Sequence, residues 1–200
     1  MEREDWDRRY AGQELVWSAG PNQFVADVLA AAPPGRALDL ATGEGRNAIW
    51  LAERGWRVTG VDFSAAGLAK ARALAEARGV EVDWVVADAR EYDGAGYDLV
   101  LIAYLHLPAD QNAAVLRRAA AALAPGGTFL LIGHDRTNLT DGIGGPQDPD
   151  VLHTPDEVVA ALDGLEIQRA ERVHRTVETE EHRGAAIDTL VLAVRPGLDR

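Results

Sequence analysis

From residue 36 to residue 131 the chain alternates short apolar runs with alanine-rich segments of helical character. This alternation is typical of repeated strand–helix–strand units, in which a helix crosses over between two parallel strands and covers a face of the sheet. The apolar runs predict strands over 36–40, 57–61, 82–86, 98–102 and 128–133. The segments between them predict helices over 46–54, 65–78 and 110–123.

A loop rich in Gly, Pro and Asp spans 134–153, and its composition is typical of either a lid or a mobile connection. It runs into Thr154-Pro155-Asp156-Glu157, which is a helix start signal. Thr154 can cap the helix, Pro155 suits its first position, and Glu157 completes a capping box.

The last part of the chain predicts two strands, 166–176 and 187–194, joined by a polar turn at 178–184. Strands joined without a crossover helix must pair antiparallel. The predicted fold class is therefore α/β, a three-layer sandwich whose seven-stranded, mostly parallel sheet carries an antiparallel C-terminal hairpin. We expect a single domain over 1–200. Its parts are an N-terminal segment (1–35), a core (36–133), and the loop, helix and hairpin (134–200).

Composition narrows the function. The chain of 200 residues has no cysteine, which excludes disulfides, thiolate metal sites and cysteine nucleophiles. No apolar run approaches the twenty residues of a membrane span, and the charged start of the chain does not resemble a secretory signal, so we expect a cytoplasmic protein without a membrane partner. A net charge of −12 and scattered arginines argue against nucleic acid as a partner.

Residues 38–47 read as an apolar strand, a glycine turn and a helix start. Gly43 and Gly45 let the backbone turn sharply and let a nucleotide-type ligand approach the free N–H groups of the next helix. The spacing also fits a dinucleotide fingerprint. Asp39 and Glu44, however, would each repel a pyrophosphate by roughly 3 kcal/mol at about 5 Å and an effective dielectric of about 20. The same acids would attract the ammonium and sulfonium of S-adenosylmethionine.

Two more acids end successive predicted strands. Asp62 follows the second strand about twenty residues after the glycines, where a carboxylate accepts the ribose hydroxyl protons. Asp88 follows the third strand, where it could accept from an adenine amino group, with Phe63 and Ala89 flanking the ring. Either acid alone would equally suit a cap or a turn. Together with the glycine turn, they favour an adenosine site.

These residues resemble the class I S-adenosylmethionine-dependent methyltransferases over 36–194, which implies a Rossmann-like fold. Residues 39–45 are similar to the first motif of that family, although Ala41 stands at its usual first glycine, where we expect a modest backbone adjustment. Residues 97–100 and 123–127 resemble the fourth-strand motif and the turn before the fifth strand. Trp6, Tyr10, Trp17 and Pro21-Asn22 resemble the leader of the thiopurine and tellurite-resistance methyltransferases.

The resemblance implies that S-adenosylmethionine is held by the strand-end loops and covered by N-terminal aromatic side chains, whose ring faces attract a sulfonium. The residues implied are Trp6, Tyr10, Trp17, Asp39, Ala41, Gly43, Gly45, Asn47, Asp62, Phe63, Asp88, Ala89, Ala103 and Tyr104. Any of the three aromatics could instead simply pack a terminal helix onto the core. Core packing is the preferred interpretation for Trp50, Trp56 and Trp84.

Methyl transfer is an in-line displacement that needs neither a metal nor an enzyme nucleophile. A thiolate, selenide or halide acceptor needs no base, whereas a hydroxyl or a protonated nitrogen does. The candidate bases follow the fourth and fifth strands: His106, and His134 with Asp135, which either orients His134 or caps a turn. His153, His174 and His182 are interpreted as structural or solvated.

The leading hypothesis is methyl transfer to a small molecule. The alternatives are an NAD(P)-dependent oxidoreductase and an S-adenosylmethionine-binding module without catalysis. The absence of a Tyr-x-x-x-Lys pair disfavours the oxidoreductase, because Lys70 is the only lysine. A monomer and a homodimer both fit the sequence.

Overall fold

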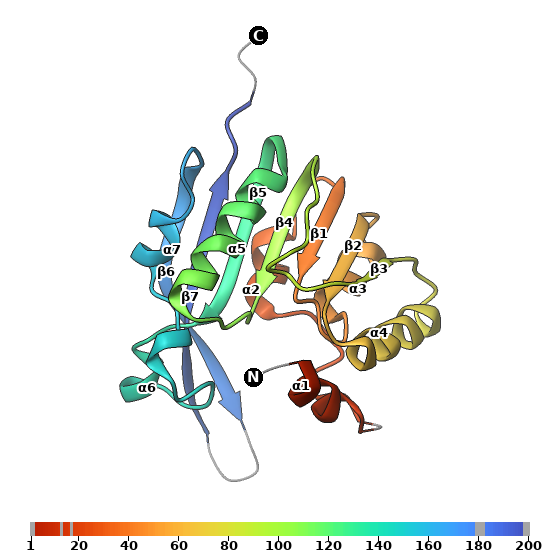
Figure 1. Cartoon of the computed structure of the whole chain (residues 1–200), viewed down its shortest axis with the longest axis horizontal. Coiled ribbons are helices and arrows are strands. Elements are labelled where there is room, and N and C mark those ends of the chain that lie inside the picture. Colours follow the sequence, from red (N-terminus) through yellow and green to blue (C-terminus); the bar gives the residue numbers. More distant parts are fainter. Residues whose placement is uncertain (1–2, 13, 17, 179–182, 198–200) are drawn as a thin grey trace.

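The computed structural model describes residues 3–12, 14–16, 18–178 and 183–197. Seven strands form one sheet in the order β3-β2-β1-β4-β5-β7-β6 (Figure 1). The strands are β1 (Arg36–Leu40), β2 (Arg57–Asp62), β3 (Asp83–Val86), β4 (Tyr97–Ala103), β5 (Leu123–His134), β6 (Glu166–Glu178) and β7 (Arg183–Val194). The helices are α1 (Arg3–Tyr10), α2 (Gln23–Leu29), α3 (Arg46–Glu53), α4 (Ala65–Ala77), α5 (Ala109–Ala122), α6 (Asn138–Asp141), the 3-10 helix η1 (Pro149–Val151) and α7 (Pro155–Ala160).

Strands β1 to β5 pair in parallel, and β7 pairs antiparallel with both β5 and β6. The predicted α/β fold, with its mostly parallel seven-stranded sheet and antiparallel hairpin, is confirmed. The strand order reverses between β1 and β4, and ligands of such sheets bind at the carboxyl ends of the strands at this point.

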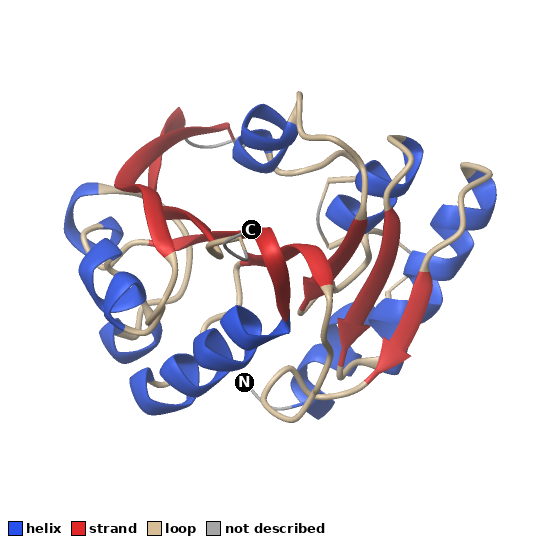
Figure 2. Cartoon of the chain, turned by 90° about the horizontal axis from the view of Figure 1, so that it is seen from above, coloured by secondary structure: helices blue, strands red, loops and turns tan. Residues whose placement is uncertain are grey.

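The sheet lies between two layers of helices, as the view from above shows (Figure 2). Along β4 the side chains alternate, because successive residues of a strand point to opposite faces. Val100 and Ile102 face a core that includes α5 and α7, whereas Leu99 and Leu101 face a core that includes α2 and α3. All four are at most 1% exposed, so both faces of the strand are buried.

Several elements differ from the prediction. Helices α1 and α2 were not predicted; Asn22 caps α2 by accepting hydrogen bonds from the backbone N–H groups of Phe24 and Val25. Strand β5 begins at Leu123 rather than at 128, because Leu123 pairs with Tyr97 before a register shift. The hairpin strands are longer than predicted because their pairing continues to the end of each strand. The helix start at Thr154 is confirmed, since its hydroxyl oxygen accepts from Glu157 N–H.

Candidate active site

The glycine turn after β1 is shaped by left-handed backbone. Gly43 (φ 58°) and Gly45 (φ 80°) lie in the left-handed region, and so does Ala41 (φ 60°). This conformation costs a residue with a side chain about 1–2 kcal/mol. A Cβ on Gly45 would lie 2.5 Å from the Trp84 ring, so the turn packs directly on this side chain. Ala41 thus adopts the left-handed conformation although it is not a glycine, and the Trp84 ring packs against the turn.

Helix α1 places Tyr10 over the turn. A Cβ on Gly43 would meet the Tyr10 hydroxyl at 2.8 Å, and the ring of Trp6 stacks on that of Tyr10 with centroids 5.4 Å apart. Asp7 fixes the helix by accepting a hydrogen bond from the Ser64 hydroxyl at the start of α4. Two of the three predicted aromatics therefore lie beside the glycine turn. Trp17 lies outside the described residues.

The two acids near the turn do not act as the sequence interpretation assumed. Glu44 is 3% exposed, lies 3.0 Å from Lys70 Nζ and accepts from Val16 N–H, so its charge is compensated. Asp39 is 1% exposed and accepts from the Thr42 hydroxyl at 2.6 Å, and burial raises its pKa to about 7. The argument from two free negative charges against a pyrophosphate is therefore wrong, because one carboxylate is paired and the other is buried.

Burial of Asp39 predicts a pH-dependent stability. A carboxyl group with a pKa of about 7 when folded and 3.8 when unfolded holds its proton more tightly in the native state. Its stabilising contribution is therefore complete below pH 3.8 and is lost as the pH rises toward and through 7. We expect Asp39→Asn to remove a fall of about 2 kcal/mol in the free energy of unfolding between about pH 5.5 and 8. Urea unfolding at both pH values measures it, and an equal fall in the variant would contradict the assignment.

Asp62 ends β2 beneath the glycine turn. Its Oδ2 accepts from Gly43 N–H and its Oδ1 from Ser64 N–H, both at 2.8 Å. Burial raises the pKa of this carboxyl, which is 6% exposed. Each carboxylate oxygen has a second lone pair, so both can still accept from ligand hydroxyls. The residue thus joins the turn to β2 and keeps the capacity to bind a ligand.

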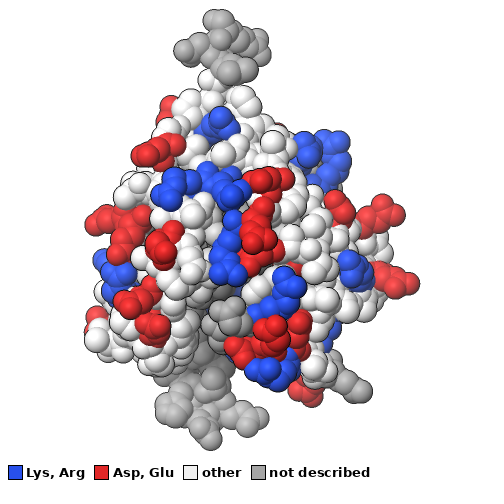
Figure 3. Space-filling view, in the orientation of Figure 1, with Lys and Arg blue, Asp and Glu red and all other residues white. Residues whose placement is uncertain are grey.

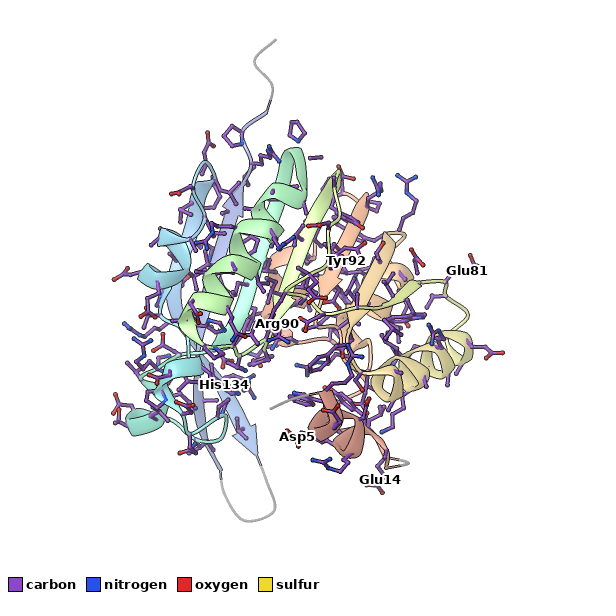
Figure 4. The ribbon with its side chains drawn as sticks, in the orientation of Figure 1. Asp5, Glu14, Glu81, Arg90, Tyr92 and His134 are labelled. Carbon is purple, nitrogen blue, oxygen red and sulfur yellow. The ribbon has the colours of Figure 1, made fainter. Side chains whose placement is uncertain are left out.

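Asp88 is held locally. The Arg90 side chain donates to both carboxylate oxygens and lowers the pKa of Asp88. An adenine amino group would have to share this carboxylate with Arg90. Ala89 is buried and Phe63 is half-buried at the same end of the sheet. Figure 4 shows Arg90 near the middle of the view, above His134, Asp5 and Glu14.

Tyr104 follows Ala103 at the end of β4 and has a positive φ of 61°, which is uncommon for a bulky residue. Its hydroxyl accepts from Asn22 Nδ2 at 3.0 Å and donates to Asp188 Oδ2 at 2.7 Å. Asn47, at the start of α3, accepts from Asn22 N–H. Tyr104 therefore links the segment before α2 to β7. Strained backbone of this kind is frequent at functional sites.

His134 ends β5 and directly faces Asp188 of β7 in the antiparallel register. His134 Nδ1 lies 3.2 Å from Asp188 Oδ1. Although burial opposes ionisation, the close approach of His134, the hydrogen bond from Tyr104 and the charge of Arg175 lower the pKa of Asp188. The sequence analysis missed this residue. The available signal was an acid within the apolar run of β7, which indicates a partnered, buried carboxylate.

Asp135 does not contact His134 in any hydrogen bond that the described residues make. Its Oδ1 accepts from the Thr137 N–H and hydroxyl and from Arg172 Nε, and its Oδ2 accepts from the Thr189 hydroxyl. The expectation that Asp135 orients His134 is therefore not met. Asp135 instead caps the start of the loop, because it accepts from the Thr137 N–H and hydroxyl.

The other described histidines differ in burial and in hydrogen-bond partners. His106 Nε2 accepts from His134 N–H at 3.1 Å, and burial holds the pKa of this ring well below the ordinary value. His153 is 2% exposed, its Nε2 bonds Leu105 O at 2.9 Å, and burial lowers its pKa to about 4. His174 is exposed on β6. His182 lies outside the described residues.

Two arginines border Tyr104. Arg46 at the start of α3 and Arg175 on β6 have their guanidinium carbons 5.8 and 5.7 Å from the ring centroid. Burial lowers the pKa of Arg46, and the charge of Arg175 lowers it further. Two cations therefore lie close to the ring whose hydroxyl donates to Asp188. Sequence analysis did not single out either arginine.

Comparison with known proteins identifies the core that carries this site. Residues 37–127 match the family described as "Methyltransferase domain". They form a methyltransferase domain. Its fold is the Rossmann-like fold of class I methyltransferases, because the magnesium protoporphyrin IX methyltransferase ChlM of Synechocystis PCC 6803, crystallised with bound S-adenosylhomocysteine, superposes with a TM-score of 0.69 at 20% identity, over 96% of this chain and 93% of that chain.

TehB from Haemophilus influenzae has the same fold, with a TM-score of 0.74 at 18% identity over 96% of this chain and 66% of that chain. Demethylmenaquinone methyltransferase of Thermus thermophilus is 39% identical to this chain over 126 residues, 60% of this chain and 55% of the relative. A tRNA 5-carboxymethoxyuridine methyltransferase of Escherichia coli is 35% identical over 128 residues, 60% of this chain and 47% of the relative. The chain thus spans about half the length of these two relatives.

Proposed function

We propose that this chain transfers the methyl group of S-adenosylmethionine to a small-molecule acceptor. The observation that carries the proposal is the Asp62 carboxylate beneath a glycine turn in a methyltransferase domain. The turn fits the donor: Gly43 and Gly45 present no Cβ, and Asp62 keeps lone pairs for two ribose hydroxyls. Bound there, S-adenosylmethionine would supply an electrophilic methyl group that needs no metal.

The remaining residues would complete the donor site. Trp6 and Tyr10 would exclude water and attract the sulfonium by about 0.5 to 2 kcal/mol. Asp88 and Ala89 would contact the adenine, and Ala103 and Tyr104 would border the methionine part. The chain's task is to hold both reactants in line, which can supply effective molarities on the order of 10⁵ M.

A small acceptor is favoured over nucleic acid. The net charge is −12, and on the face shown in Figure 3 the basic groups near the centre are flanked by acidic groups on both sides. Phosphodiester backbones are bound by concentrated positive charge. Among the residues that the structure describes, no helical segment has the length and hydrophobicity of a membrane span.

Calorimetry tests the donor assignment. We expect S-adenosylmethionine and S-adenosylhomocysteine to bind at one site per chain, and NADH not to bind. A panel of thiol, hydroxyl, amine, chalcogen and halide acceptors, with S-adenosylhomocysteine as the measured product, then tests transfer. Binding of NADH alone would favour an oxidoreductase. Donor binding without turnover of any acceptor would favour a non-catalytic module. Turnover of a tRNA transcript but of no small molecule would overturn the acceptor class.

A further inference from the structure

His134 and Asp188 lie side by side, and the two atoms that face each other are both buried without a hydrogen-bond partner among the described residues. They are opposite residues of β5 and β7, and His134 Nδ1 and Asp188 Oδ1 lie 3.2 Å apart. Both atoms are buried, and neither makes a hydrogen bond, to the other or to any further group, among the residues that the structure describes. A buried polar atom without a partner is costly. The free energy therefore favours a proton shared between these two atoms.

The carboxylate side of the pair is fixed. Asp188 is 0% exposed, and its Oδ2 accepts from the Tyr104 hydroxyl at 2.7 Å and from Arg175 Nε at 3.1 Å. These donors come from the residue that follows β4 and from β6. They hold Oδ1 toward His134.

The ring side is also fixed. The His134 ring stacks on His106 with centroids 5.3 Å apart and an interplanar angle of 20°. On the loop after α6, a Cβ on Gly145 would lie 2.9 Å from the His134 ring, so the backbone of this loop packs against it. The side chain is 13% exposed while Nδ1 is buried. Nε2 is therefore the ring nitrogen that a ligand can reach.

We propose that Asp188 is a positioning residue that keeps the proton of the neutral His134 ring on Nδ1, so that Nε2 accepts a proton from the methyl acceptor. The inference rests on the proposed function and deepens it. It specifies an acceptor with an ionisable O–H, N–H or S–H group rather than a halide. Asp188, and not the neighbouring Asp135, supplies the orientation.

The step balances without a further reactant. The acceptor atom forms a bond to the methyl carbon as the carbon–sulfur bond breaks, and that bonding pair stays on the sulfur, which becomes a neutral thioether. The acceptor proton passes to His134 Nε2 and leaves an imidazolium. The Asp188 carboxylate stabilises this cation, and solvent removes the proton afterwards. General-base catalysis of this kind is typically worth about 10²–10⁴-fold.

The charged and titratable groups around His134 come from four elements. Asp188 lies on β7 and Arg175 on β6. Tyr104 and His106 follow β4, and His153 follows the loop. Because Arg175 and Tyr104 both donate to Oδ2, they leave Oδ1 to His134.

Asp188→Asn tests the pair without an acceptor. Tyr104 and Arg175 both donate, so they will hold the amide oxygen on their side and turn the NH₂ group toward His134. Nδ1 must then accept, and the ring proton moves to Nε2. We expect ¹⁵N NMR of the side chain, assigned with His134→Gln and recorded at about pH 8 where an ordinary histidine is neutral, to show protonated Nδ1 in the wild type and protonated Nε2 in the variant. The same tautomer in both proteins would overturn the proposal.

Asp135→Asn is the matched control. Asp135 is equally buried and is also held by an arginine of β6, but its Oδ2 partner is the Thr189 hydroxyl, which can rotate to accept from an amide. We expect this variant to fold and to leave the His134 tautomer unchanged. A tautomer shift in Asp135→Asn as well would mean that any loss of a buried charge produces it, which would remove the specific role of Asp188.

Kinetics separate this inference from the proposed function. For each protic acceptor that the wild type methylates, we expect kcat to fall about 100-fold in Asp188→Asn and His134→Gln, with S-adenosylhomocysteine affinity within about twofold of wild type. A donor that does not bind would sink the proposed function and leave the tautomer result standing. Unchanged rates in both variants, or turnover of halides alone, would sink the inference and leave methyl transfer intact.

Discussion

Asp62→Ala is expected to weaken S-adenosylhomocysteine binding by at least tenfold, a loss of about 1.4 kcal/mol or more. The variant removes the proposed acceptor of the ribose hydroxyls. It also frees Gly43 N–H and Ser64 N–H, which the carboxylate now binds. The glycine turn therefore loses both a ligand contact and its link to β2. Calorimetry of the folded variant measures the effect.

The matched control is Asp98→Ala. Asp98 also accepts from a backbone N–H, that of Arg36 at 2.7 Å, but at the start of β4, away from the carboxyl ends of the strands. We expect its affinity for S-adenosylhomocysteine to equal that of the wild type. Unchanged affinity in a folded Asp62→Ala would refute the ribose assignment, and an equal loss in both variants would point to a general effect on the sheet.

Asp135→Ala is expected to lower the free energy of unfolding by about 1–3 kcal/mol. The side chain is 0% exposed and accepts from Thr137, Arg172 and Thr189, so alanine leaves the buried Thr189 hydroxyl and the half-buried Thr137 without this acceptor, while the exposed Arg172 can turn to water. Because about 1 kcal/mol shifts the Tm of a chain of this size by roughly 2–4 °C, the change is large enough to measure by thermal or urea unfolding.

Asp141→Ala provides the comparison, because Asp141 belongs to the same loop but is exposed. We expect its stability to lie within about 0.5 kcal/mol of the wild type. A stable Asp135→Ala that had lost turnover would contradict the structural assignment and restore the catalytic role that the sequence suggested.

The sheet was predictable because its signals are local. Apolar runs such as β1 and the run of β4 carry their own periodicity, and Thr154 with Glu157 carries its own cap. The start of β5 was not predictable, because the pairing of Leu123 with Tyr97 is a contact between distant segments. The short helix α2 depends on the Asn22 cap and on burial of Val25 and Leu29 rather than on a long periodic pattern.

The same contrast between local sequence signals and contacts between distant segments holds for the site. The residues of the glycine turn and Asp62 are placed by strand ends, which the sequence marks. The pairing of Glu44 with Lys70 and the pairing of His134 with Asp188 depend on which segments meet in space. A one-residue shift in strand register would have brought a different side chain opposite His134. For this reason the sequence suggested the adjacent carboxylate, Asp135, instead of the cross-strand one.

The last strand of the sheet along the chain, β7, lies inside it, between β5 and β6. During synthesis on the ribosome, β6 therefore leaves the exit tunnel before the strand that joins it to the sheet exists. His134 therefore gains Asp188 as its neighbour only once β7 has inserted between β5 and β6.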